Sequence, residues 1–193
     1  MTVHAAFLSF PKLGERVNGD GALVRRDDRE RVLVAVVDSL GHGPGAAEAT
    51  QVAMASLEAC ELASPVVDLM QGLHAALRST RGAAATICVI QGRKIAVCAV
   101  GNVQLASANA TVPLVLSSGV LGHRVPKFRV CEGELRPGAR IALFSDGISS
   151  KFRLDESLRL KPAEACRLAI ERHRKHEDDS TILMADMDGQ DGH

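Results

Sequence analysis

Four aspartates in separate parts of the chain are the residues best suited to chemistry. Asp38 ends the apolar run VLVAVVD, Asp146 ends IALFSD, Asp178 begins DDSTILMA, and Asp20 lies in NGDGA. A single aspartate beside glycine at a strand end is usually a turn residue. Several such acids can converge at one edge of a sheet, where their charges repel unless a cation lies between them. Carboxylates without cysteine or histidine ligands suit hard cations, so the set predicts a site for Mg²⁺ or Mn²⁺.

The loop after Asp38 has a second interpretation, because GHGPGA (Gly41 to Ala46) also fits the dinucleotide-binding pattern G-x-G-x-x-A. However, the Asp38 carboxylate would repel a pyrophosphate at the following helix N-terminus. Two helices then replace the second strand of a βαβ unit. Close approach of the backbone to a metal explains the glycines better, with the Ser39 carbonyl as a further ligand. His42, in the same loop, either touches substrate or points to solvent.

Two other motifs near the C-terminus are assigned to structure. The segment CRLAIER (Cys166 to Arg172) has the C-x5-R spacing of cysteine phosphatases, but it has no glycine and lies inside a predicted helix. Its amides are therefore committed to the helix and cannot cradle a phosphate. His173 and His176 are three residues apart and lack a third ligand nearby, so a partly solvated helix end is favoured over a metal site.

The composition favours one globular domain over residues 1–193. The chain is 46% hydrophobic, Lys plus Arg and Asp plus Glu both number 23, and Trp and Tyr are absent. A neutral chain without these aromatic rings is not typical of nucleic-acid or membrane binding. The N-terminus lacks the features of a signal peptide or a membrane span. Five widely spaced cysteines in apolar surroundings favour reduced thiols, as expected of a cytoplasmic protein. We also expect the protein to be a monomer.

Apolar patterning predicts the elements that must position the aspartates. The N-terminal segment 1–10 and the valine-rich run Val32 to Val37 indicate strands. Helical spacing follows the glycine loop, a second helix opens at Pro65, and a third opens at Pro162. Further short apolar runs indicate an antiparallel meander and a last strand, at 84–90, 94–100, 103–108, 127–131, 140–144 and 181–185. The expected fold class is α+β, with sheets covered by helices.

The chain as a whole resembles the PPM (PP2C-like) serine/threonine phosphatases, in particular the SpoIIE-type branch and its small stand-alone stressosome phosphatases. The resemblance rests on Asp20 in GDG, Asp38 in VVDSLGHGPGA, Asp146 in FSDGI, Asp178 in DDSTILM, and the segments RGAAATICVI (81–90) and VGNV (100–103). It implies a four-layer αββα sandwich in which two mostly antiparallel sheets are flanked by helices. It also implies a centre with two divalent ions, Mn²⁺ or Mg²⁺, at one edge of the paired sheets.

Each aspartate acquires a separate role from this resemblance. Asp38 would bridge both metal ions, Asp146 and Asp178 would complete the shell of one, and Asp20 with the Ser39 carbonyl would serve the other. The first three would be catalytic through the water that they help the metals to activate, and that water would attack the phosphoryl group in line. No cysteine, serine or histidine arrangement in the chain offers a covalent route instead.

The resemblance also implies a substrate class and leaves other functions open. The substrates would be phosphoserine or phosphothreonine on STAS-domain stressosome proteins, so that dephosphorylation resets stress signalling. Larger relatives hold the substrate phosphate with an arginine near the N-terminus; no residue here matches clearly, and Arg16 is the one candidate. The alternatives are a non-catalytic PP2C-like binding module and a metal-dependent hydrolase of a small phosphoester.

Overall fold

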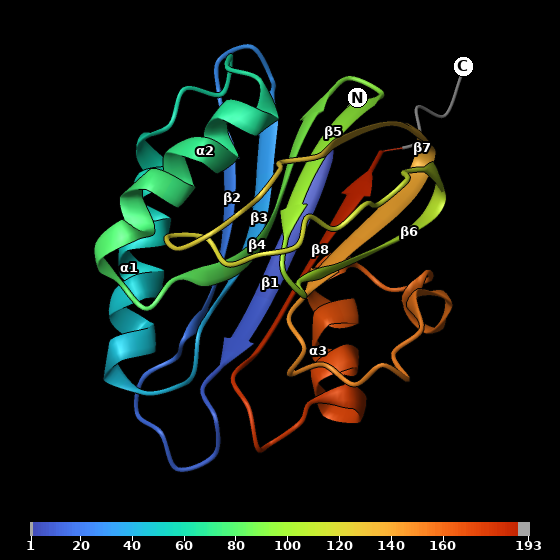
Figure 1. Cartoon of the computed structure of the whole chain (residues 1–193). Coiled ribbons are helices and arrows are strands. Elements are labelled where there is room, and N and C mark those ends of the chain that lie inside the picture. The colour runs from blue at the N-terminus through green and yellow to red at the C-terminus, as the bar shows by residue number, and fades with distance from the viewer. Residues whose placement is uncertain (1, 189–193) are drawn as a thin grey trace.

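The computed structural model describes residues 2–188 as two facing sheets covered by helices (Figure 1). The strands are β1 (Val3–Phe10), β2 (Asp20–Arg26), β3 (Val32–Ser39), β4 (Ala83–Gln91), β5 (Lys94–Val100), β6 (Gln104–Thr111), β7 (Val130–Phe144) and β8 (Ser180–Met187). The helices are α1 (Pro44–Ala59), α2 (Val66–Ala76), α3 (Pro162–His173) and the 3₁₀ helices η1 (Leu77–Ser79) and η2 (Leu154–Ser157). No helix within residues 2–188 is long and apolar enough to span a membrane.

Strand β7 joins the two sheets. The named strands pair antiparallel, in the order β1-β8-β7-β5-β4-β3-β2, and β6 pairs with β7 as well. Residues 130–134 of β7 pair with β5, whereas residues 140–144 pair with β8. Between them lie Pro137 and Gly138, and Gly138 has a φ of 74°, a conformation that glycine adopts readily. One long strand therefore contributes its first part to one sheet and its second part to the other.

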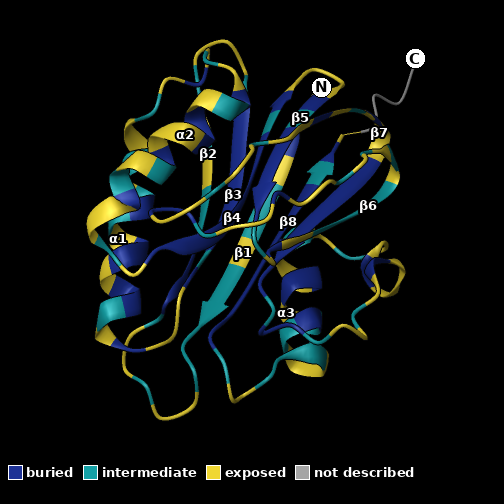
Figure 2. Cartoon of the chain, in the orientation of Figure 1, coloured by how far each residue is buried: buried dark blue, intermediate teal, exposed yellow. Residues whose placement is uncertain are grey.

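Three apolar cores separate the four layers of the αββα sandwich. Successive residues of β3 alternate between two of them, because side chains in a strand point to opposite faces. Leu33 packs towards α1 and α2, whereas Val34 packs against Leu183 of the facing sheet. The third core lies between the second sheet and α3, and it includes Cys166. Figure 2 shows the result, with buried strands between helices that each expose one face.

The expected α+β sandwich is confirmed, and the differences concern individual elements. The strand predicted at 140–144 and the last two residues of the one predicted at 127–131 belong to the single strand β7. The segment 20–26, not predicted as a strand, is β2, whose arginines interrupt the apolar pattern. Helix α1 begins at Pro44, inside the predicted glycine loop, because proline is tolerated in the first turn of a helix. Helix α2 begins at Val66, one residue after Pro65.

Candidate metal centre

Asp20 and Asp38 form the centre of the candidate site. Asp20 is the first residue of β2, and it lies directly opposite Asp38 of β3 in the antiparallel register. Residues paired in this way project from the same face of a sheet with their Cβ atoms about 5 Å apart. Asp20 is only 5% exposed. The β2–β3 register thus places two carboxylates side by side in a poorly solvated position.

Burial and neighbouring acids disfavour the charged form of both groups. Burial, followed by the negative charges of Asp20, Asp146 and Asp178, raises the pKa of Asp38 to about 8. For Asp20, burial is again the main cause and raises the pKa to about 7, although a hydrogen bond from Ser145 opposes the shift. Like charges that act on one another in this way identify a shared site of negative potential, which a divalent cation would neutralise.

Asp146 and Asp178 reach this site from the second sheet. Asp146 follows the end of β7, and Asp178 lies just before β8, so the β7–β8 pairing brings both loops to the same edge. Burial first and the charge of Asp146 second raise the pKa of Asp178. The Asn102 side chain donates to Asp146 Oδ2 at 2.8 Å. Asp38 is therefore within electrostatic range of the other three predicted aspartates, Asp20, Asp146 and Asp178.

Ser145 connects the two sheets behind the carboxylates and was not identified from the sequence. Its hydroxyl donates to Asp20 Oδ2 at 2.6 Å and accepts from the Thr181 amide at 3.0 Å. Its own amide donates to the Thr181 carbonyl at 3.0 Å. Ser145 is fully buried. The residue fixes the orientation of Asp20, and its position directly before Asp146 in FSDGI was the signal available in the sequence.

Asp179 has a structural role that distinguishes it from Asp178. Its Oδ1 accepts from the Lys12 amide at 2.8 Å, and its Oδ2 accepts from the Gly19 amide at 3.0 Å. Both carboxylate oxygens therefore tie the β1–β2 loop to the start of β8. In contrast, Asp178 Oδ1 accepts only the amide of Asp179, at 2.9 Å. Of this adjacent pair, Asp178 is the acid that remains available to a ligand.

Ser39 and the glycine loop connect Asp38 to α1. The Ser39 amide donates to the Gly19 carbonyl at 3.0 Å, and the Ser39 hydroxyl shares a hydrogen bond of 2.8 Å with Thr50 of α1. These contacts hold the backbone beside Asp38, where the Ser39 carbonyl was predicted to serve a metal. A Cβ added to Gly45 would lie 2.6 Å from Arg81 Nε. Gly45 is the second residue of α1, so the Arg81 side chain lies against the start of that helix.

His42 contacts two neighbouring side chains, neither of which is one of the four candidate aspartates. Its Nδ1 is 2.8 Å from Glu15 Oε1, and its Nε2 is 3.1 Å from Lys12 Nζ. Its side chain is 46% exposed. The ring therefore bridges two residues of the β1–β2 loop.

The donor set fits hard divalent cations. It consists of oxygen atoms from Asp20, Asp38, Asp146, Asp178 and the Ser39 backbone, which are the ligands that Mg²⁺ and Mn²⁺ prefer. Within residues 2–188, no three His, Cys, Asp or Glu side chains already converge on one point as a metal cage. The fit consequently rests on the paired register of Asp20 and Asp38 and on the chemistry of the donors.

The other motifs of the sequence contribute no second centre. Burial raises the pKa of the Cys166 thiol to about 11, and the residue lies inside α3, so a thiolate nucleophile is not available. All five cysteines are free. His173 packs edge-to-face against Phe152 at 5.6 Å between ring centroids, and His176 is exposed. The assignment of these residues to structure agrees with these positions.

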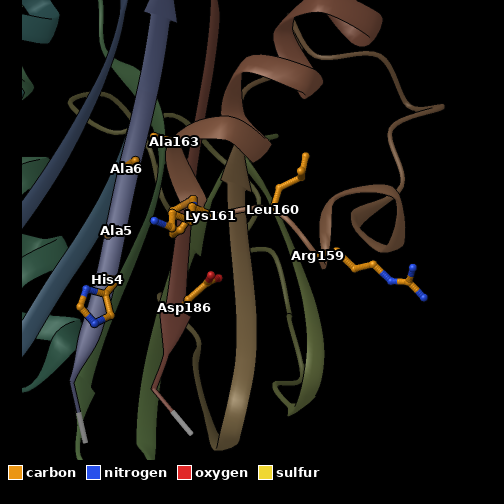
Figure 3. Close-up of a pocket in the computed structure, with 9 residues that line it drawn as sticks. His4, Ala5, Ala6, Arg159, Leu160, Lys161, Ala163 and Asp186 are labelled. Atoms are coloured by element: carbon orange, nitrogen blue, oxygen red, sulfur yellow. The ribbon is translucent and has the colours of Figure 1, made fainter.

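A surface cavity of about 570 Å³ lies away from the carboxylates (Figure 3). It is lined by His4 and its neighbours in β1, by the segment 159–163 at the start of α3, and by Asp186 of β8. Both Oδ atoms of Asp186 accept hydrogen bonds from the Arg140 guanidinium. Because this cavity lies at the opposite end of β1 and β8 from Asp178, it does not belong to the candidate site.

Comparison with known proteins identifies a family and several similar structures. Residues 28–188 match the family model described as stage II sporulation protein E (SpoIIE). No curated protein gives a significant match. One solved structure, from work on the bacterial stressosome as a modular system adapted to control secondary messenger signaling, is 29% identical. It aligns over 96% of this chain and 100% of its own, with a TM-score of 0.87.

Two phosphatase structures share the fold at lower identity. RsbX in complex with magnesium is 22% identical, with a TM-score of 0.82 over 95% of this chain and 94% of that chain. The catalytic domain of the serine/threonine protein phosphatase PstP in complex with two manganese ions is also 22% identical. Its TM-score is 0.71 over 95% of this chain and 97% of that chain. At these identities the likeness concerns the fold.

Proposed function

The chain belongs to the SpoIIE family and has the PP2C-like fold, and from this premise we propose that it is a metal-dependent protein serine/threonine phosphatase. The observation that carries the proposal is the position of Asp38, which lies directly opposite Asp20 and within electrostatic range of Asp146 and Asp178. A group with this many acidic neighbours is suited to bridge two cations. The similar PstP structure binds two manganese ions, which supports the proposed number.

Each residue would have a defined part in holding the ions. Asp38 would contact both, Asp146 and Asp178 would complete one shell, and Asp20 with the Ser39 carbonyl would serve the other. The bound cations would supply the Lewis acidity that activates water and neutralises phosphoryl charge. The protein orients its ligands: Ser145 donates to Asp20, and Asn102 donates to Asp146, so neither carboxylate rotates freely.

The proposed substrates are phosphorylated STAS-domain stressosome proteins. Support comes from the similar structures, one described with the bacterial stressosome and one as RsbX. The surface near the carboxylates also suits a protein partner, because it exposes two leucines. Leu13 in the β1–β2 loop is 74% exposed, and Leu40, directly after Ser39, is 45% exposed. Apolar groups in such positions favour a protein over a small phosphoester, whose recognition needs an enclosed pocket.

Paired assays on two substrates test this function. Wild-type protein is expected to release phosphate from p-nitrophenyl phosphate and from a phosphorylated STAS-domain protein when Mn²⁺ is added, and EDTA should abolish both activities. The protein substrate should be turned over with the higher kcat/KM. If p-nitrophenyl phosphate is hydrolysed as well as or better than the phosphorylated protein, the result would favour a hydrolase of small phosphoesters. Metal binding without turnover of either substrate would favour a non-catalytic binding module.

A further inference from the structure

Positive charge is concentrated in one part of this neutral chain. Residues 69–131 contain seven of the 23 Lys and Arg residues and none of the 23 Asp and Glu residues. Arg78, Arg81 and Arg124 are three of the seven, and all three are exposed. Within residues 2–188 none of these three forms an ion pair with an acid; the arginines that do are Arg31, Arg93, Arg140, Arg153 and Arg172. The charges of Arg78, Arg81 and Arg124 therefore remain available to a binding partner.

The segment between β6 and β7 crosses to α2 and carries two basic side chains there (Figure 1). His123 Nε2 donates a hydrogen bond to the Arg81 carbonyl at 2.8 Å, because a carbonyl oxygen can only accept. Arg124 follows His123 directly. Burial, followed by the positive charges of Arg78 and His123, lowers the pKa of His74 in α2, so both groups lie within electrostatic range of that ring. These contacts gather four basic side chains, Arg78, Arg81, His123 and Arg124, which we call the basic rim.

The basic rim borders the candidate metal centre. The Leu121 amide donates to the Ala83 carbonyl at 2.9 Å, and the Ala83 amide donates to the Leu121 carbonyl at 3.2 Å. Ala83 in turn lies opposite Ser39 in the β3–β4 pairing, at the end of β3 where the candidate aspartates lie. Arg81 lies against the loop that follows Ser39, since a Cβ added to Gly41 would be 3.1 Å from Arg81 Nη1. A substrate whose phosphoryl group reaches the metal centre would therefore place its neighbouring residues beside the rim.

We propose that the basic rim binds an acidic segment next to the phosphorylated residue of the protein substrate. The inference rests on the proposed phosphatase function and adds to it a preference for acidic sequence context. The phosphoryl group itself goes to the metal centre, and the rim contacts carboxylates on the flanking residues. Opposite charges on two partners speed their encounter and fix their orientation. A nucleic acid fits this surface less well, because the chain has no Trp or Tyr on which bases could stack.

Three synthetic phosphoserine peptides that differ only in the residues flanking the phosphoserine test the inference. These residues are glutamate in the first peptide, glutamine in the second and lysine in the third. With Mn²⁺ at low salt, we expect the wild-type protein to have the lowest KM for the glutamate peptide and the highest for the lysine peptide. Each exposed charge pair should change KM by about 1.4-fold to fivefold, and the preference should shrink as NaCl is added.

Charge reversal in the rim should invert this preference. In Arg124→Glu the ratio of kcat/KM for the glutamate peptide to that for the glutamine peptide should fall, and in Arg78→Glu/Arg124→Glu the lysine peptide should become the better substrate. p-Nitrophenyl phosphate, assayed in parallel, corrects each variant for effects on the metal centre. Lys94→Glu is the matched control and should keep the wild-type preference. Lys94 is exposed and lies opposite Gln91, at the other end of the β4–β5 pairing from Val100.

Three results would overturn the inference. The first is equal KM values of the wild-type protein for the three peptides. The second is a Lys94→Glu variant whose preference changes as much as that of Arg124→Glu. The third is wild-type protein that binds poly(U) RNA through the rim, so that Arg124→Glu loses RNA binding while its peptide preference is unchanged.

A wild-type protein that hydrolyses none of these substrates would contradict the proposed function alone. Fluorescence anisotropy with labelled forms of the same peptides then decides the role of the rim. Tighter binding of the glutamate peptide than of the lysine peptide, lost in Arg124→Glu and kept in Lys94→Glu, supports the inference. Equal binding of both peptides overturns it.

Discussion

The carboxylate of Asp20 faces that of Asp38 across the β2–β3 pairing, and the pKa values of the two groups are raised to about 7 and about 8. Such an arrangement is unfavourable when both groups are charged, since burial removes the water that would screen them. The protein therefore gives up stability at the position that the proposed function needs most. This relationship makes effects on stability and effects on activity separable.

Asp38→Asn is expected to abolish Mn²⁺-dependent hydrolysis and to stabilise the metal-free protein. Activity is lost because an amide cannot replace a bridging carboxylate. In EDTA near pH 8, the free energy of unfolding should rise by on the order of 1 kcal/mol, the equivalent of about one pKa unit, because repulsion with Asp20 is removed. Urea denaturation and a phosphatase assay on the same preparation check both effects. A destabilised variant would show that Asp38 has a structural partner instead.

The stability of the metal-free protein should decrease as the pH rises from about 5 to about 8. Burial raises the folded-state pKa values of Asp20 and Asp38 above the ordinary value of 3.8, so in this range the folded state binds more protons than the unfolded state. The stability contributed by this proton binding is complete below the unfolded pKa and is lost as the pH passes the folded values. Denaturation in EDTA across this range measures the slope, which should become shallower in Asp38→Asn and in saturating Mn²⁺.

Asp178 and Asp179 should respond differently to the same substitution. Asp179→Asn turns one oxygen that accepts an amide proton into a donor, and the expected cost is about 1–3 kcal/mol of folding stability with metal affinity largely kept. Asp178→Asn should lower Mn²⁺ affinity and activity with little change in stability. Calorimetry and thermal unfolding of the two variants distinguish these outcomes. The reverse pattern would exchange the roles that we give to the two residues.

Gly147 permits the close approach of the loop after Asp146 to the start of β8. A Cβ at Gly147 would lie 1.8 Å from the Asp179 carbonyl oxygen, so Gly147→Ala must displace backbone and should cost about 3 kcal/mol or more. Gly72 in α2 offers the matched control, since its Cβ would have nothing within 4 Å. Gly72→Ala should stabilise the protein by roughly 0.5–1 kcal/mol through helix propensity. Equal effects in urea denaturation would contradict the placement of these loops.

The sequence predicted the parts of the site that follow from local pattern. Valine-rich and other apolar runs located β3, β7 and β8, and the acids at their ends indicated Asp38, Asp146 and Asp178. The pairing of Asp20 with Asp38 depends on the register of β2. This strand was not predicted, because its arginines interrupt the apolar pattern. The hydrogen bonds of Ser145 and Lys12 depend on contacts between distant segments, which spacing along the chain does not reveal. Likewise, only the fold separates the anchoring role of Asp179 from that of Asp178.

The binding of Mn²⁺ to wild-type protein and to Asp38→Asn, measured side by side by titration calorimetry, tests the central claim most directly. We expect wild-type protein to bind two Mn²⁺ ions and Asp38→Asn to bind neither, while circular dichroism shows that the variant remains folded. Wild-type protein that binds no divalent cation, or a variant that binds Mn²⁺ as wild type does, would contradict the assignment of this carboxylate edge as a metal centre.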